Sequence, residues 1–179
     1  MRYCPQCGRE TIMRTVDRRE RRVCPDGACG FVFWNNPVPV VAVIVETTEG
    51  VVLAHHVSWA PGKFSIITGF LEAGEDPAAT ACRETREELG LTPRQPTLIG
   101  VYPFARSNQV LLAYHLVAEG DIILNEELDA FKIIPRNKMK AWPFGTGLAV
   151  ADWLKMIGLT PGRDGALPGR TLEEKPSKI

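Results

Sequence analysis

Runs of apolar residues, separated by turn-forming residues, divide most of the chain into short strands. The longest run is Pro37–Glu46, PVPVVAVIVE, which is rich in valine and nearly free of polar residues. Such a run is typical of a strand that is buried on both faces. Val51–His55 follows after a turn and is predicted to be its hairpin partner. Further strands are expected at Ser65–Thr68, at Leu98–Phe104, at Val110–Val117 and through Ile134.

Two other segments have the end signals of helices. Asp76 is a suitable N-cap, Pro77 suits the first helical position, and Gly90 suits the residue after the last turn. Farther along, Thr146 can cap a helix over Gly147–Ile157, whose apolar residues recur on one face. That apolar face predicts that the second helix packs on the core.

Glutamates cluster along the first helix and the loop before it. Glu84, Glu87 and Glu88 have the spacing i, i+3 and i+4, which places them on one helix face. Like charges at these spacings repel, so a cation is expected to neutralise them, and Mg²⁺ or Mn²⁺ prefers carboxylate oxygen. The preceding loop, Gly69–Glu75, leads to a helix N-terminus, where free N–H groups favour anionic ligands. The alternative is a solvated acidic helix end.

Four of the five cysteines form two pairs near the N-terminus. Cys4 and Cys7 make the first pair, Cys24 and Cys29 the second, and sixteen residues lie between the pairs. Such pairs on glycine-bearing turns predict a zinc ribbon, in which four thiolates surround one Zn²⁺ and leave no open position for catalysis. Two disulfides are the alternative. The fifth cysteine, Cys82, is expected to serve packing.

The totals of the sequence limit the classes of function. A chain of 179 residues suits one ordinary domain and a small module, and contents of 45% hydrophobic and 23% charged residues are globular values. The net charge is zero, so no general attraction to nucleic acid or membranes follows, although residues 1–36 hold seven arginines against four acidic residues. Because no apolar run is long enough to span a membrane and no signal peptide is recognised, a cytoplasmic protein is expected.

The stretch Gly69–Leu91, GFLEAGEDPAATACRETREELGL, resembles the signature of the Nudix hydrolases. Every charged and glycine position of that signature is present, and only Thr85 departs from it, where the family has a bulky aliphatic residue. The resemblance implies an α/β fold of Nudix type, with a mixed sheet between helices, and cleavage of nucleoside diphosphates linked to another moiety. Arg83 is expected to hold an acidic partner in place. The implied metal ligands, which also form the catalytic centre, are Glu75, Glu84, Glu87, Glu88 and the carbonyl of Gly69.

The resemblance also implies groups outside the signature. Relatives often carry a further acidic residue that acts on the attacking water; Glu126 aligns best with it and Glu127 second, with a solvated acidic turn as the alternative. The segment from Tyr102 to Ser107, YPFARS, is similar to the Trp-Pro-Phe-Pro-x-Ser motif of NADH pyrophosphatases. Tyr102 and Phe104 are therefore candidates to stack on a nucleotide base, with core packing as the alternative for Phe104.

The role of a pair of adjacent histidines is also open. His55 and His56 lie where Nudix proteins often carry a basic residue that contacts substrate. Adjacent strand positions face opposite ways, so at most one of the two can face a ligand. A surface pair near a strand end is the alternative.

A zinc ribbon before a Nudix domain is typical of the NADH pyrophosphatase branch. We expect the ribbon over residues 1–36, the hydrolase domain over 37–159 and a disordered tail over 160–179. The leading hypothesis is a Mg²⁺-dependent pyrophosphohydrolase of a dinucleotide such as NADH or NAD⁺. The alternatives are hydrolysis of ADP-ribose or another nucleoside diphosphate derivative, and a nucleotide- or RNA-binding module without turnover. Nucleic acid is left open as a partner but not favoured, and relatives of this branch are often homodimers.

Overall fold

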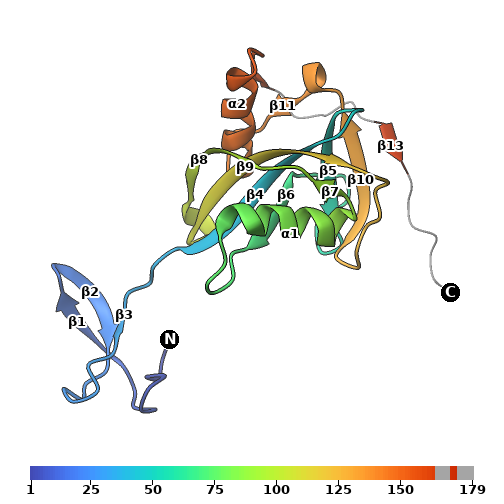
Figure 1. The fold of residues 1–179 in the computed structure, drawn as a ribbon. Coiled ribbons are helices and arrows are strands. Elements are labelled where there is room, and N and C mark those ends of the chain that lie inside the picture. Colours follow the sequence, from blue (N-terminus) through green and yellow to red (C-terminus); the bar gives the residue numbers. More distant parts are fainter. Residues whose placement is uncertain (164–169, 173–179) are drawn as a thin grey trace. The chain divides into compact units, whose positions relative to one another are not determined.

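The computed structural model describes residues 1–163 and 170–172. The chain divides into two compact units, Met1–Pro37 and Val38–Ile179. Their boundary lies one residue after the one expected from the sequence. Figure 1 shows the elements of each unit, and each is described by itself. No helix among the described residues is both long and apolar enough to cross a membrane.

The first unit is a small three-stranded antiparallel sheet in the order β1-β2-β3. Its strands are β1 (Ile12–Val16), β2 (Arg19–Val23) and β3 (Val32–Phe33). Asp17 and Arg18 form the β1–β2 turn, and both have positive φ, of 51° and 63°. A two-residue hairpin turn of this kind matches the right-handed twist of its strands. The buried side chains of the unit are few and lie close to the cysteines; they are Cys4, Thr11, Val23 and Cys24.

The second unit is a mixed sheet with one helix on each face (Figure 1). The sheet follows the order β13-β10-β5-β4-β9-β7, while β6 also pairs with β4 and β8 with β9. Its strands are β4 (Val38–Glu46), β5 (Val51–His56), β6 (Ile67–Phe70), β7 (Thr92–Pro93), β8 (Thr97–Phe104), β9 (Gln109–Glu119), β10 (Leu128–Ile134) and β13 (Arg170–Leu172). The helices are α1 (Pro77–Leu89) and α2 (Thr146–Met156), and β11 (Lys140–Ala141) pairs with β12 (Gly162–Arg163). The expected mixed sheet between helices is confirmed.

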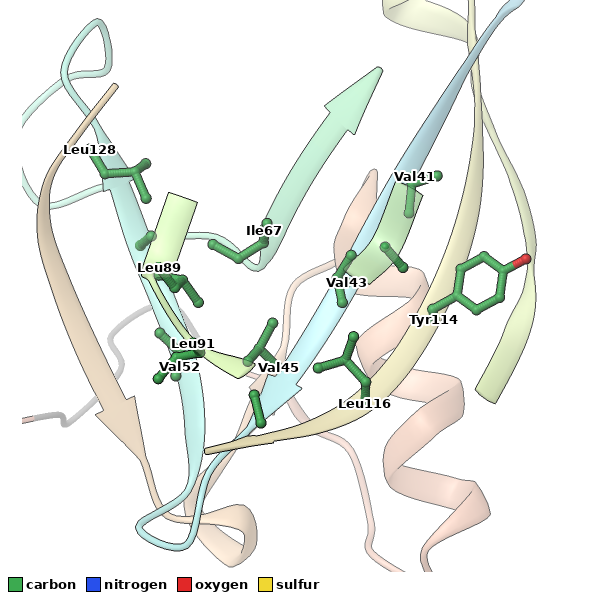
Figure 2. Packing of buried hydrophobic residues seen from close by; sticks show 13 residues of the cluster. Val41, Val43, Val45, Val52, Ile67, Leu89, Leu91, Tyr114, Leu116 and Leu128 are labelled. Carbon is green, nitrogen blue, oxygen red and sulfur yellow. The ribbon is translucent and has the colours of Figure 1, made fainter. Parts of the chain in front are cut away.

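Strand β4 lies at the centre of the sheet, and its alternate residues enter two separate cores. Val41, Val43 and Val45 pack with residues of α1, whereas Ala42 and Ile44 pack with residues of α2. Figure 2 shows the first core, in which side chains from β4, β5, β6 and β9 meet Leu89 at the end of α1. A strand with both faces buried accounts for the unbroken apolar run in its sequence.

The predicted hairpin of β4 and β5 forms only at its turn. The two strands are paired at Glu46 and Val51, and then they diverge. Val40–Val43 of β4 pair instead with β6, antiparallel, while the whole of β4 pairs in parallel with β9. Because β6 pairs with the edge of β4 that β5 would occupy in a full hairpin, β5 and β6 separate here into two branches of the sheet. The residues that follow β6 enter the loop before α1.

Other boundaries shift by one to three residues. The loop expected over Gly69–Glu75 begins later, because Gly69 and Phe70 belong to β6 and pair with β4. Gly145, not Thr146, is the N-cap of α2. Within the segment 160–179, Gly162–Arg163 and Arg170–Leu172 are strands. Residues 164–169 and 173–179, the remaining part of the expected disordered tail, lie outside the described residues.

Candidate functional site

Helix α1 begins and ends where its sequence predicts. The side chain of Asp76 accepts hydrogen bonds from the backbone N–H groups of Ala78 and Ala79, at 2.9 and 3.1 Å. Gly90 ends the helix in the left-handed conformation, with φ 69°. These caps fix the register of the helix, so Glu84 and Glu88 are turned toward the protein and are 8% and 7% exposed. Glu87 lies at the edge of this face with its side chain 56% exposed.

Arg83 connects three of the signature glutamates. Its Nε and Nη2 donate to the two oxygens of Glu75, at 2.7 and 3.1 Å. Its Nη1 donates to Glu84 at 2.8 Å and to Glu87 at 2.9 Å. This bidentate contact with Arg83 lowers the pKa of Glu75 to about 2. Arg83 was expected to hold one acidic partner in place, and it pairs with three. Its contact with Glu75 also fixes the loop between β6 and α1.

The guanidinium group of Arg83 also ties α1 to β6. Its Nη2 also donates to the carbonyl of Phe70, at 3.2 Å. The sequence offered no signal for this contact, because a backbone carbonyl of any residue could supply it. Together with the contacts to Glu75, it fixes the loop between β6 and α1 on both sides.

Gly69 lies directly beneath the carboxylate of Glu84. A Cβ atom at position 69 would lie 1.9 Å from the carboxyl carbon of Glu84, which is far inside contact distance. A side chain at position 69 would therefore displace the Glu84 carboxylate from its present place. The backbone of Gly69 and a buried carboxylate are brought together, as a shared site requires.

Glu88 is the least compensated acid of the cluster. Among the described residues it has no ion pair, whereas Arg83 pairs with Glu75, Glu84 and Glu87. Burial, and then the charges of Glu84, Glu127 and Glu87, raise the pKa of Glu88 to about 8. Burial also raises the pKa of Glu84. The charged form of a nearly buried carboxylate beside other acids is costly in free energy unless a proton or a cation neutralises it.

The loop between β9 and β10 brings another acid to this cluster. Its backbone is tied to the end of α1, because Ile123 N–H donates to the carbonyl of Leu89 at 2.8 Å. The charge of Glu127 contributes to the raised pKa values of both Glu84 and Glu88. For the acid that acts on the attacking water, the sequence favours Glu126 first and Glu127 second. Both side chains are exposed, and this electrostatic coupling favours Glu127.

The donor chemistry of these residues suits a hard divalent cation, but their ligand atoms are not gathered: within the described residues only the four ribbon cysteines have ligand atoms that all lie within 4.8 Å of one another. Carboxylate oxygens from Glu84, Glu87 and Glu88 project from one face of α1, with a backbone strand next to them. This is an oxygen-only donor set of the kind that Mg²⁺ and Mn²⁺ prefer. The excess of negative charge around Glu88 is what such an ion would balance. Within the described residues Arg83 is the cation paired with this cluster.

Thr85, the departure from the signature, is accommodated inside α1. It is fully buried, and its hydroxyl donates to the carbonyl of Ala81 at 2.7 Å. The hydrogen bond one turn back satisfies the hydroxyl that replaces an aliphatic group. The helix runs unbroken through this position.

Tyr102 and Phe104 lie on the sheet face that α2 covers. Tyr102 packs against the second core and donates its hydroxyl to Asp152 of α2, at 3.0 Å. The ring of Phe104 lies next to Gly145, just before α2. The carboxylates of α1 belong to the opposite face, so the two aromatic residues are not placed among them. Their role in substrate binding stays a prediction.

His55 is buried and ties the β5–β6 loop to β10. Its Nδ1 lies 2.6 Å from a carboxylate oxygen of Asp129, and its Nε2 lies 3.1 Å from the carbonyl of Ala60. His56, by contrast, is half-buried and accepts a hydrogen bond from the backbone of Ser58. The two side chains thus have different surroundings, as adjacent strand positions require. The sequence did not indicate the partner Asp129, which lies 74 residues away.

The four cysteines of the ribbon converge on one point. All four Sγ atoms lie within 4.8 Å of one another. The Sγ distances between Cys4 and Cys29 and between Cys7 and Cys24 are 3.6 and 3.5 Å, far longer than the bond of about 2.0 Å in a disulfide. Tetrahedral zinc with Zn–S bonds of about 2.3 Å separates its sulfurs by about 3.8 Å. The cluster fits structural zinc, and none of the five cysteines forms a disulfide.

Comparison with known families identifies the class. Residues 36–151 match the NUDIX domain, and residues 2–35 match the Nudix N-terminal zinc ribbon. Because the first match covers more than half of the chain, the chain belongs to the Nudix hydrolase family. The resemblance read from Gly69–Leu91 and from the cysteine pairs is confirmed.

Individual relatives narrow the comparison. The chain is 31% identical over 127 residues to the NAD-capped RNA hydrolase NudC of Pseudomonas aeruginosa, a match covering 70% of this chain and 44% of that protein. NudC of Vibrio parahaemolyticus is 29% identical over 114 residues, covering 64% of this chain and 42% of that protein. The chain thus spans less than half the length of these relatives. Among solved structures, a NUDIX hydrolase from Nitrosomonas europaea has a TM-score of 0.70 at 25% identity, covering 91% of this chain and 97% of that one.

Proposed function

We propose that the protein is a Mg²⁺-dependent pyrophosphohydrolase that cleaves the diphosphate bridge of a dinucleotide such as NADH or NAD⁺. The observation that carries the proposal is the pair of nearly buried carboxylates, Glu84 and Glu88, on one face of α1. Glu88 has no cationic partner among the described residues, and Gly69 lies in contact with Glu84. A cation in this place both stabilises the acids and attracts a diphosphate.

The chain's own groups divide the work as follows. Glu84, Glu87, Glu88 and the carbonyl of Gly69 would hold the cation, which when bound neutralises charge on the phosphoryl oxygens. Arg83 keeps the carboxylates in place, and its pairing with Glu75 orders the loop. Glu75 was also expected to be a ligand, and both of its oxygens are already bound by Arg83. We therefore assign Glu75 to positioning.

An acid near the cluster is needed to accept the proton of the attacking water. Glu127 fits this role because its charge acts on both Glu84 and Glu88. Glu126, the adjacent residue, is the alternative. Replacing each in turn with Gln separates them, since the general base alone should lose a large part of kcat while KM changes little.

The dinucleotide substrate is inferred from the combination of two modules. A zinc ribbon precedes the NUDIX domain here, and the relatives NudC of Pseudomonas and Vibrio are named NAD-capped RNA hydrolases. We expect Phe104, with Tyr102, to contribute to the nucleotide pocket. We also expect a homodimer and a cytoplasmic location, which the molar mass in solution and cell fractionation test.

A panel assay tests the substrate. The protein is incubated with Mg²⁺ and, separately, NADH, NAD⁺, ADP-ribose, a diadenosine polyphosphate and NAD-capped RNA, and the products are separated. We expect two mononucleotides from NADH or NAD⁺. Preferential cleavage of ADP-ribose would replace the dinucleotide assignment. Tight nucleotide binding without turnover of any compound would contradict an enzyme and favour a binding module.

The glutamate assignment has its own test. Glu87→Gln keeps the size of the side chain but removes one charged ligand, so kcat should fall about a thousandfold or more. The melting temperature should change little, since Glu87 is largely exposed. Glu49→Gln, at an exposed position in the turn between β4 and β5, is the matched control and should retain full activity. Turnover that persists in Glu87→Gln would show that the ligand set is wrong.

A further inference from the structure

The β1–β2 hairpin of the ribbon is strongly basic. Residues 12–23 hold five arginines against two acidic residues, although the whole chain has a net charge of zero. Residues 1–36 contain seven of the fourteen arginines of the chain and none of its lysines. Guanidinium groups bind phosphate with two parallel hydrogen bonds and stack on flat rings, which ammonium groups do not. The presence of arginines without any lysine therefore indicates a binding role in addition to solubility.

Four of these arginines have no acidic partner in the described part of the chain. Arg14, Arg18, Arg19 and Arg22 are exposed and take part in none of its ion pairs. Two arginines of the same unit that lie outside the hairpin are paired, Arg2 with Glu10 and Arg9 with Asp26. The hairpin thus keeps uncompensated positive charge although acids are available nearby.

The arrangement across the strands places positive charges and an aromatic ring in one row. Arg14 of β1 lies directly opposite Arg21 of β2. The guanidinium of Arg21 lies 4.7 Å from the ring centroid of Trp34 and donates to the Trp34 carbonyl at 2.8 Å. Trp34 is 45% exposed. Like charges opposite one another destabilise a strand pair, and an anionic ligand would remove that penalty.

We propose that this hairpin, with Trp34, binds single-stranded nucleic acid. The arginines would contact the phosphates, and Trp34, held by Arg21, would stack on a base. Basic grooves with aromatic side chains are the common means of binding single strands. An acidic protein segment would satisfy the charges but would give no reason for an exposed tryptophan beside them.

The proposal concerns binding by the first unit and does not depend on hydrolysis. Nucleic acid is expected to bind the full chain in the absence of Mg²⁺ and in the Glu87→Gln variant. If no dinucleotide is cleaved but single strands bind, the proposed function fails and this proposal stands. If dinucleotides are cleaved but single strands do not bind, the proposed function stands and this proposal of nucleic-acid binding fails.

Fluorescence anisotropy of the full-length, zinc-loaded protein tests the charges. The probes are labelled RNA and DNA single strands of about twelve nucleotides, titrated at several salt concentrations around 0.1 M. The double variant Arg14→Ser with Arg19→Ser, two exposed arginines on the same sheet face as Arg21, should weaken binding about tenfold or more. It should also lower the slope of log affinity against log salt by about 1.4, which is about 0.7 for each lost contact to a single strand. The matched control, Lys138→Ser with Lys140→Ser in the second unit, removes the same charge and should bind as the original protein does.

Trp34→Ala tests the stacking contact. It should weaken binding about tenfold with an unchanged salt slope, and Trp34→Phe should restore most of the affinity. Each variant must retain its zinc, which shows that the ribbon is folded. Equal binding by the arginine variant and the original protein would overturn the proposal. So would equal loss in the lysine control, or competition by polyglutamate as strong as that by RNA.

Discussion

The four cysteines of the ribbon and the glutamates of α1 are supported in different ways. The cysteine Sγ atoms lie within 4.8 Å of one another, on two turns joined by a sheet with few buried side chains. The glutamates of α1 extend from a helix that packs on a large apolar core, part of which Figure 2 shows. Arg83 pairs with Glu84 and Glu87 of this helix and with Glu75 of the loop before it. In the ribbon, two of the four candidate zinc ligands are themselves among the few buried side chains, whereas in the second unit a separate apolar core supports the helix that carries the candidate ligands.

This difference teaches what each metal has to do. A unit of 37 residues buries too little apolar surface to fold alone, so its metal must supply the free energy of folding. The second unit has two apolar cores, one on each face of β4, so we expect it to fold without a metal. Its cation can therefore be bound and released, which suits catalysis. The predictions below test this contrast.

The largest effect is expected from removing zinc. Cys24→Ser deletes one buried thiolate, and structural zinc contributes about 10 kcal/mol or more to the folding of such small units. We expect the ribbon to unfold while the second unit stays folded. Metal analysis should show the loss of about one equivalent of zinc, and hydrogen exchange should show loss of protection confined to residues 1–37.

Cys82→Ser is the control for this experiment. Cys82 lies in α1, and its Sγ is 3.9 Å from the carbonyl of Arg94, far from any zinc ligand in the sequence. Its replacement should leave the zinc content and the ribbon unchanged. A Cys24→Ser protein that keeps its zinc and its protected amides would show that the ribbon has a core of its own.

The next effect is expected at Gly69. In Gly69→Ala the new methyl group would lie 1.9 Å from the carboxyl carbon of Glu84, so the carboxylate must move. We expect kcat to fall about a hundredfold, as when a positioning contact of a metal site is lost, with the fold retained. Gly162→Ala, where the nearest atom is 3.6 Å away, is the control and should have normal kinetics. Normal activity of Gly69→Ala would show that the position of Glu84 does not matter.

Local features of the fold and the site were predictable, and pairings distant in sequence were not. The valine run predicted β4, and Asp76 and Gly90 predicted both ends of α1. The fork of the sheet was missed because β6 competes with β5 for the same edge of β4, and a short apolar run does not encode which strand wins. The hydroxyl of Tyr102 was likewise assigned without Asp152, which lies 50 residues away.

The choice between Glu126 and Glu127 shows a further limit. Both follow the same loop in the sequence, and neither has a periodic pattern around it that would give its direction. In the structure the loop is fixed by hydrogen bonds to the end of α1, and the charge of Glu127 contributes to the raised pKa values of Glu84 and Glu88. Such a contact between a loop and a helix end depends on the whole fold.

The smallest effect is expected from Arg83→Lys. Lysine keeps the charge but cannot bind Glu75 with two parallel hydrogen bonds while also reaching Glu84 and Glu87. The ligands then lose their support but not their charge, so kcat should fall about tenfold and the Mg²⁺ concentration for half-maximal activity should rise. Arg86→Lys, exposed on the same helix, should match the original protein. If both variants behave alike, the glutamates are positioned by the helix alone, and the two metal sites are less different than their contacts indicate.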